Sequence, residues 1–166
     1  MKYLWIIRHA KSSWADPQQR DFDRGLNARG RRDGERLRDY LAQLPNSPTW
    51  LWCSSARRAL DTAAYVGAGF AIAEHQCVTL DDLYHASASA VLDVLQGTPN
   101  EVESVAVVAH NPGLTDLVNG LGAEPVIDNL PTFGIAQFCF AGEHFSDLRF
   151  GNASLVQLLT PKSLRG

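Results

Sequence analysis

Two apolar runs of this chain end in a histidine, and the residue types around those histidines could bind an anion. Residues 3–7 lead directly into Arg8-His9, and residues 105–109 lead into His110. A short apolar run bounded by polar residues is typical of a strand in a parallel sheet. The carboxyl ends of such strands share the edge at which α/β proteins bind ligands. We therefore expect Arg8, His9 and His110 to lie together in an anion site.

The elements that must position these residues alternate along the chain between strand and helix patterns. Strands are predicted at about residues 3–7, 50–53, 74–80, 104–109, 134–140 and 154–159. Helices are predicted at about residues 27–44, 55–66, 87–95 and 112–121, the second capped by Ser54 or Ser55 and ended by Gly67 and Gly69. This alternation predicts an α/β fold, a three-layer α/β/α sandwich around a mixed, mostly parallel sheet, in a single domain over residues 1–166.

Composition limits the partners of the protein. Of the 166 residues 45% are hydrophobic and 20% charged, and the formal net charge of -3 gives no general affinity for nucleic acid or acidic membranes. Three cysteines, Cys53, Cys77 and Cys139, form no CxxC pair, which favours reduced thiols over disulfides or a zinc site. No apolar run approaches the roughly 18 residues of a membrane span, and Arg8 interrupts the first run too early for a signal peptide. These features predict a cytoplasmic protein.

Several blocks of the sequence together resemble the histidine phosphatase superfamily. The first block is Arg8-His9-Ala10, the second is the Ser-Arg-Ala-Thr-Ala pattern of residues 54–63, and the third is the strand that ends in His110. Residues 8–12, residues 23–30, Leu83-Tyr84 and residues 110–113 are similar to the SixA-like phosphohistidine phosphatases within it. The resemblance implies a phosphoglycerate mutase-like fold.

The same resemblance implies a role for each residue in phosphoryl transfer. His9 is expected to attack phosphorus and form a covalent phosphohistidine, with its other ring nitrogen donating to a backbone carbonyl. Arg8 and Arg58 are expected to clamp the phosphoryl oxygens, because arginine forks bind two oxygens at once. Arg57 competes with Arg58, but the spacing of four residues from Ser54 and to Thr62 selects Arg58. His110 is expected to bond a further oxygen, protonated beside the dianion, and no metal or cofactor is needed.

The general acid is less clearly marked in the sequence. Superfamily members often use a Glu or Asp between the second and third blocks, and residues 80–84 offer Asp82 first and Asp81 second. Some SixA-like members have no dedicated acid. A phosphoramidate needs less help from an acid than a phosphate ester, because its P–N bond is labile and its leaving imidazole is a base.

The short stretch between Thr62 and His110 predicts an open cleft, whereas phosphoglycerate mutases carry longer insertions that cover the site. An open cleft suits a phosphohistidine on another protein, such as a histidine-containing phosphotransfer domain. The alternatives are a phosphatase of small phosphate esters with the same site, and a phosphate-binding module without turnover. Trp14 is a candidate for the pocket mouth. His75, His85 and His144 belong to no motif, and we expect surface or structural roles for them.

Overall fold

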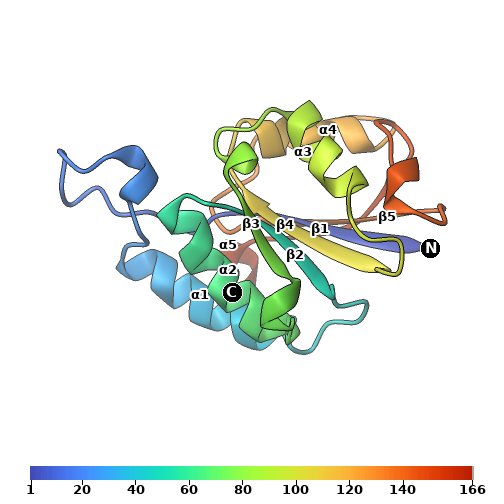
Figure 1. The fold of residues 1–166 in the computed structure, drawn as a ribbon. Coiled ribbons are helices and arrows are strands. Elements are labelled where there is room, and N and C mark those ends of the chain that lie inside the picture. Colours follow the sequence, from blue (N-terminus) through green and yellow to red (C-terminus); the bar gives the residue numbers. More distant parts are fainter. Residues whose placement is uncertain (166) are drawn as a thin grey trace.

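The fold is built on one six-stranded sheet that brings together strands from both ends of the chain (Figure 1). This computed structural model describes residues 1–165. The strands are β1 (Lys2–Arg8), β2 (Trp50–Ser54), β3 (Cys77–Leu80), β4 (Ser104–Ala109), β5 (Ile135–Phe140) and β6 (Ser154–Leu159). Their order is β3-β2-β4-β1-β5-β6; the first four are parallel, and β5 and β6 are antiparallel to their neighbours. The prediction of a mixed, mostly parallel sheet is confirmed.

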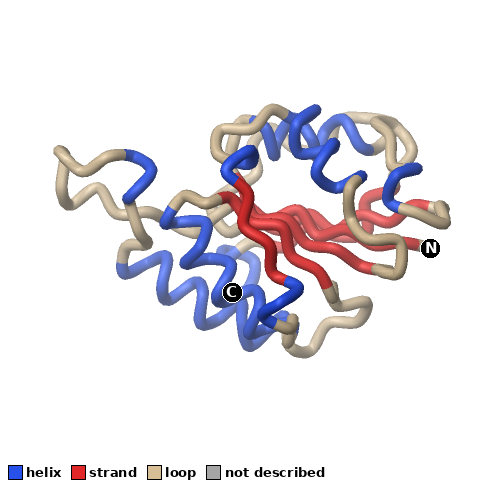
Figure 2. The backbone as a smooth tube through the Cα atoms, viewed as in Figure 1, coloured by secondary structure: helices blue, strands red, loops and turns tan. Residues whose placement is uncertain are grey.

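Helices cover both faces of the sheet and complete the predicted three layers (Figure 2). On one face lie α1 (Ala28–Leu41), α2 (Arg57–Phe70) and α5 (Pro161–Arg165); on the other lie α3 (Ala88–Gln96) and α4 (Gly113–Leu121). Every residue of β4 is buried, with Val105 and Val107 in one apolar cluster and Ala106 and Val108 in the other. Because successive side chains of β4 point to opposite faces of the sheet, this strand contributes to both halves of the core. Among the described residues, no helix is long and apolar enough to cross a membrane.

The pairing of β1 with β4 determines where the two histidines emerge. The strands run parallel in a register that places Arg8 opposite Ala109. The amide of His9 continues the ladder by donating to the carbonyl of Ala109 across 3.3 Å. His9 and His110 are thus the next residues on neighbouring strands, at the same edge of the sheet.

Helix α2 differs from its predicted bounds at both ends. It begins at Arg57 with Ala56 at its N-cap, so neither Ser54 nor Ser55 caps it. It also runs through Gly67 and Gly69 to Phe70, and ends where Ala71 adopts a left-handed conformation with φ 55°. Neither glycine ends the helix, and Gly69 is a packing residue. A Cβ on Gly69 would lie 2.8 Å from the carbonyl oxygen of Arg38, so α1 and α2 approach closely at this point.

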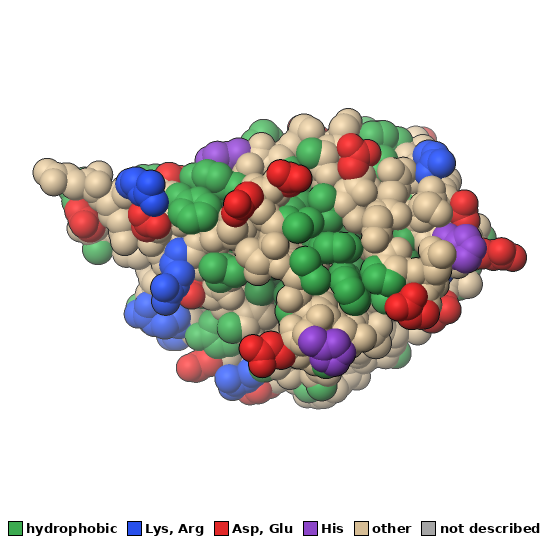
Figure 3. All heavy atoms as spheres, viewed as in Figure 1, with side chains coloured by type: hydrophobic (Ala, Val, Ile, Leu, Met, Phe, Trp, Pro, Cys, Tyr) green, Lys and Arg blue, Asp and Glu red, His purple; other side chains and the backbone are tan. Residues whose placement is uncertain are grey.

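A loop of residues 12–26, here called the arm, projects from the body of the molecule beside the site (Figures 1 and 3). Its ends are joined by a bridge between Ser12 and Leu26. Inside it, the buried guanidinium of Arg24 donates to the carbonyl oxygens of Asp16 and Gln19 at 2.9 and 2.8 Å and stacks on Trp14. The arm contains a 3-10 turn, Asp21–Asp23, which reaches back to the sheet edge.

We expect Gly69→Ala to destabilise the protein by about 1–3 kcal/mol, because the new methyl group would meet backbone that cannot move aside. Gly67→Ala in the same helix is the control. Its Cβ would have only Cys77 Sγ nearby, at 3.9 Å. That change should be neutral or stabilise the protein by up to about 1 kcal/mol, since alanine is the better helix former. Chemical denaturation of both variants checks this, and equal stability would contradict it.

Candidate active site

A pocket of about 250 Å³ lies at the carboxyl ends of β1 and β4. Four of the predicted residues line it: Arg8, His9, Arg58 and His110. The remaining lining residues are Lys11, Ser12, Trp14, Asp21, His85, Asn111 and Thr132. Three of the lining side chains are cationic residue types and one is a carboxylate, so the pocket carries positive charge although the whole chain is acidic.

His9 is held in a single tautomer by its neighbour in the chain. Its Nδ1 lies 2.8 Å from the carbonyl oxygen of Ala10, which can only accept, so Nδ1 carries the proton. Nε2 is consequently unprotonated, and Arg58 Nε donates to it across a long 3.4 Å. Burial lowers the pKa of His9 to about 4, and the charges of Arg58 and Arg8 add to this while the Ala10 carbonyl opposes it. The imidazole is therefore neutral at physiological pH, with a lone pair on Nε2.

One turn of α2 supplies both a cation and the support for His9. Arg58 and Thr62 are four residues apart and share a helix face. Thr62 Oγ1 donates to the carbonyl of Arg58 at 2.8 Å and accepts from the amide of Ala10 at 2.9 Å. The threonine thus fixes the backbone of Ala10, the residue whose carbonyl orients His9. This contact gives a physical reason for the Arg-Ala…Thr-Ala spacing in the sequence.

His110 is held by Ser54, the last residue of β2. His110 Nε2 and Ser54 Oγ are 2.8 Å apart, and the rings of His110 and His9 have their centroids 5.2 Å apart. Burial, and after it the neighbouring His9, Arg58 and His85, lower the pKa of His110 to about 3. These surroundings favour the neutral imidazole, and a bound dianion would favour the protonated one.

The two arginines are held by different partners. Arg8 donates to the carbonyl of Leu130 at 2.9 Å. Arg58 donates to both the carbonyl and the carboxylate of Asp21, at 2.7 and 3.0 Å. Burial and the charge of Arg58 lower the pKa of Arg8. Arg8 and Arg58 are thus close enough for their positive charges to repel each other. An anion bound between the two guanidinium groups would be favoured.

Asp82, the predicted general acid, does not line the pocket, and neither does Asp81. Both belong to the 3-10 turn Asp81–Leu83, in which Leu83 is buried in the core. Burying Leu83 leaves the two aspartates exposed on the outside of the turn. Arg57 is also outside the pocket, where it pairs with Asp61 at 2.9 Å. Of the two adjacent arginines, the structure brings Arg58 to the site.

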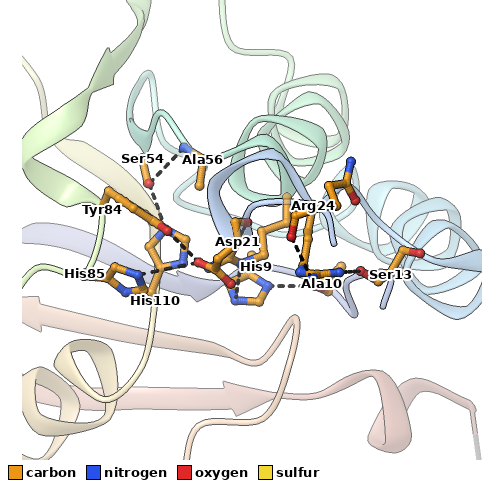
Figure 4. Close-up of polar contacts among 12 residues, drawn as sticks. His9, Ala10, Ser13, Asp21, Arg24, Ser54, Ala56, Tyr84, His85 and His110 are labelled. Carbon is orange, nitrogen blue, oxygen red and sulfur yellow. Dashed lines mark hydrogen bonds and ion pairs between the residues drawn. The ribbon is translucent and has the colours of Figure 1, made fainter. Parts of the chain in front are cut away.

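The sequence analysis gave no part in the site to three functional candidates, Asp21, Tyr84 and His85, although it named Tyr84 in a family block and expected a surface or structural role for His85. Asp21 Oδ2 accepts from the Tyr84 hydroxyl at 2.6 Å and lies 3.5 Å from His85 Nε2 (Figure 4). Partial burial opposes ionisation of Asp21, but hydrogen bonds from Tyr84 and Arg58 lower its pKa. Asp21 stands in a loop without periodicity, and only the nearby family block could have marked it. Trp14 does line the pocket, and its side chain is 66% exposed.

Comparison with known proteins identifies the family of the chain. The sequence model of the histidine phosphatase superfamily (branch 1) matches residues 4–89. An uncharacterised protein of Mycobacterium tuberculosis is 33% identical over 166 residues, which cover 94% of this chain and 100% of that protein.

Two solved structures have a similar fold. The structure of a candidate phosphohistidine phosphatase SixA from Agrobacterium tumefaciens superposes with a TM-score of 0.80 at 28% identity, covering 96% of this chain and 99% of that one. A protein histidine phosphatase SixA complexed with tungstate has a TM-score of 0.79 at 25% identity, covering 98% and 99%.

We expect nitrogen NMR of the free protein to find His9 protonated on Nδ1 and neutral down to about pH 4. His110 should stay neutral to about pH 3. Arg58→Ala should raise the pKa of His9, because it removes a positive charge that disfavours the imidazolium. A His9 that titrates near its ordinary value of about 6.5, or that carries its proton on Nε2, would contradict the geometry.

Proposed function

The chain belongs to the histidine phosphatase superfamily, and we propose that within it this protein removes the phosphoryl group from histidine side chains of another protein. The observation that carries the proposal is the unprotonated Nε2 of a neutral, buried His9 inside a cationic pocket. Such a nitrogen is a nucleophile that needs no base to activate it.

In the proposed reaction, His9 Nε2 attacks phosphorus and the bond to the leaving group breaks. The phosphoryl group is then carried on His9, and water hydrolyses the new P–N bond and restores the neutral imidazole. Arg8 and Arg58 bind the equatorial oxygens, on which the charge of the transition state is spread. His110 donates to a further oxygen. Binding a dianion would oppose the effects that now lower the pKa of His110.

The form of the pocket favours a side chain of a protein as substrate. Trp14, which lines the pocket, is largely exposed, and the arm that carries it projects from the body of the molecule (Figure 3). A phosphorylated histidine could enter such a pocket while its protein stays outside. The tungstate bound to the SixA relative is an oxyanion, as is the phosphoryl group proposed here. We include metal independence in the proposal, because two guanidinium groups at the reaction centre would repel a metal cation.

We also propose a cytoplasmic location. The three cysteines are free, and Cys53 is buried deeply enough to raise the pKa of its thiol to about 12. Unreactive, unpaired thiols are typical of a reducing compartment.

We expect Arg58→Ala to lower kcat/KM about 100-fold or more, which corresponds to about 3 kcal/mol of transition-state stabilisation. Arg57→Ala should change it much less, because Arg57 pairs with Asp61 outside the pocket. The two variants differ by one position in one helix, so steady-state kinetics on both checks the assignment. Equal losses would show that Arg58 is not the clamp.

The substrate is tested by comparing kcat/KM for a phosphohistidine-carrying protein with kcat/KM for an alkyl phosphate. Both are measured in the presence of EDTA, with His9→Ala as the inactive control. We expect a strong preference for phosphohistidine, together with an acid-labile, base-stable phosphate on the wild-type enzyme quenched during turnover. A preference for the alkyl ester would assign the protein to the phosphatases of small phosphate esters. Substantial activity in His9→Ala would overturn the covalent mechanism.

A further inference from the structure

The proposed reaction needs a proton for the leaving group. When the P–N bond of a phosphohistidine breaks, its electron pair goes to the substrate imidazole, which leaves as a neutral molecule only if its ring also carries a proton on the other nitrogen. The predicted donor, Asp82, lies outside the pocket. The pocket must therefore supply the proton from another group or rely on solvent.

Most of the groups at the pocket cannot give up a proton near neutral pH. His9 is the nucleophile and His110 is assigned to a phosphoryl oxygen, while arginine and lysine side chains are too basic to release a proton near neutral pH. Asp21 is ionised, because hydrogen bonds from Tyr84 and Arg58 lower its pKa although partial burial opposes this. Burial raises the pKa of Tyr84, and its hydroxyl already donates to Asp21. His85 is the remaining titratable side chain among the described residues that line the pocket.

From this arrangement we infer that His85, oriented by the Asp21 carboxylate, is the proton donor to the leaving imidazole. The inference rests on the proposed phosphohistidine substrate. His85 Nε2 lies 3.5 Å from Asp21 Oδ2, and its ring centroid is 4.0 Å from that of Tyr84 and 5.9 Å from that of His110 (Figure 4). Its side chain is 61% exposed, so it stands between the reacting centre and solvent.

The backbone of His85 gives a second, independent observation. Its φ is 56°, a left-handed conformation that costs a residue other than glycine of order 1 kcal/mol or more. Such strain persists where surrounding contacts enforce it, and it is frequent at functional sites. Here it directs the imidazole toward Asp21 and the pocket.

The groups around His85 come from several elements. Asp21 of the arm lies 3.5 Å from His85 Nε2, and Arg58 of α2 binds the same carboxylate oxygen at 3.0 Å. The rings of Tyr84 and His110 pack nearby, and neither is charged in this state. The exposed side chain of His85 can exchange a proton with solvent.

The proton balance of the two half-reactions is complete with His85 alone. In the first, His9 Nε2 bonds to phosphorus, the P–N bond to the substrate breaks, and the imidazolium of His85 gives its proton to the unphosphorylated ring nitrogen of the substrate. In the second, water attacks the phosphoryl group on His9 and its proton passes to His85. The bond electrons return to His9 Nε2, phosphate leaves, and both histidines are restored.

The test compares two substrates in one variant. His85→Asn keeps a residue type that tolerates the left-handed conformation but carries no exchangeable acid. We expect it to lower kcat/KM for free phosphohistidine about 100-fold, and to lower kcat/KM for p-nitrophenyl phosphate less than about threefold, because nitrophenolate departs without a proton. The parameter kcat/KM reports steps up to departure of the leaving group, so the water step does not enter. His75→Asn, an exposed histidine outside the pocket, should change neither value.

The loss of kcat/KM for phosphohistidine in His85→Asn should also become smaller as the pH falls from about 8 to about 6, because the substrate ring then takes its proton from solvent. Equal losses on both substrates, or no loss on either, would overturn the role of His85 and leave the proposed function intact. If the wild-type enzyme prefers alkyl phosphates, the proposed function fails first and the inference with it. Thermal melting of both variants separates a misfolded protein from an inactive one.

Discussion

The parallel pairing of β1 with β4 is the constraint on which the site depends. Because the register places Arg8 opposite Ala109, the chain leaves both strands at one level, and His9 and His110 follow side by side. The backbone of His9 is then held on both sides, by the carbonyl of Ala109 and by the amide of Phe133. A shift of one residue in this ladder would turn the side chains of β1 to the opposite face of the sheet and separate the two imidazoles.

Around this frame, the electrostatics of the pocket follow from burial and from a small number of cations. Burial makes a charged imidazole unfavourable, and Arg58 makes it more so, which keeps the lone pair of His9 available. The guanidinium groups of Arg8 and Arg58 repel each other, so holding them close together without a counterion would be costly. Asp21 provides one, bonded to Arg58 through both its carbonyl and its carboxylate. The orientation of Arg58 is therefore fixed by contacts within the chain.

The sequence predicted those parts of the site that depend on regular structure. The strands carrying His9 and His110 were marked by apolar runs, and the spacing of the family block from Ser54 to Thr62 selected Arg58 over Arg57. Prediction from the sequence failed where irregular backbone decides the position of a side chain. The orientation of the turn Asp81–Leu83 depends on which of its residues is buried. Leu83 is the buried one, which leaves Asp82 outside the pocket and brings His85 to it. Asp21 lies in a loop whose course is set by the hydrogen bonds of Arg24, and no local pattern records it.

The way the arm is closed has a consequence for how this architecture could diversify. Its two ends are joined by the bridge between Ser12 and Leu26, so residues between them can be added or removed without moving β1 or α1. Lengthening a loop with fixed ends costs little conformational entropy, about 0.6 kcal/mol for each doubling. An insertion at this point would lie in the same loop as Trp14, which lines the pocket. A change in arm length alone can thus change how far the pocket is covered, and with it the range of substrates. The groups at the sheet edge keep their positions.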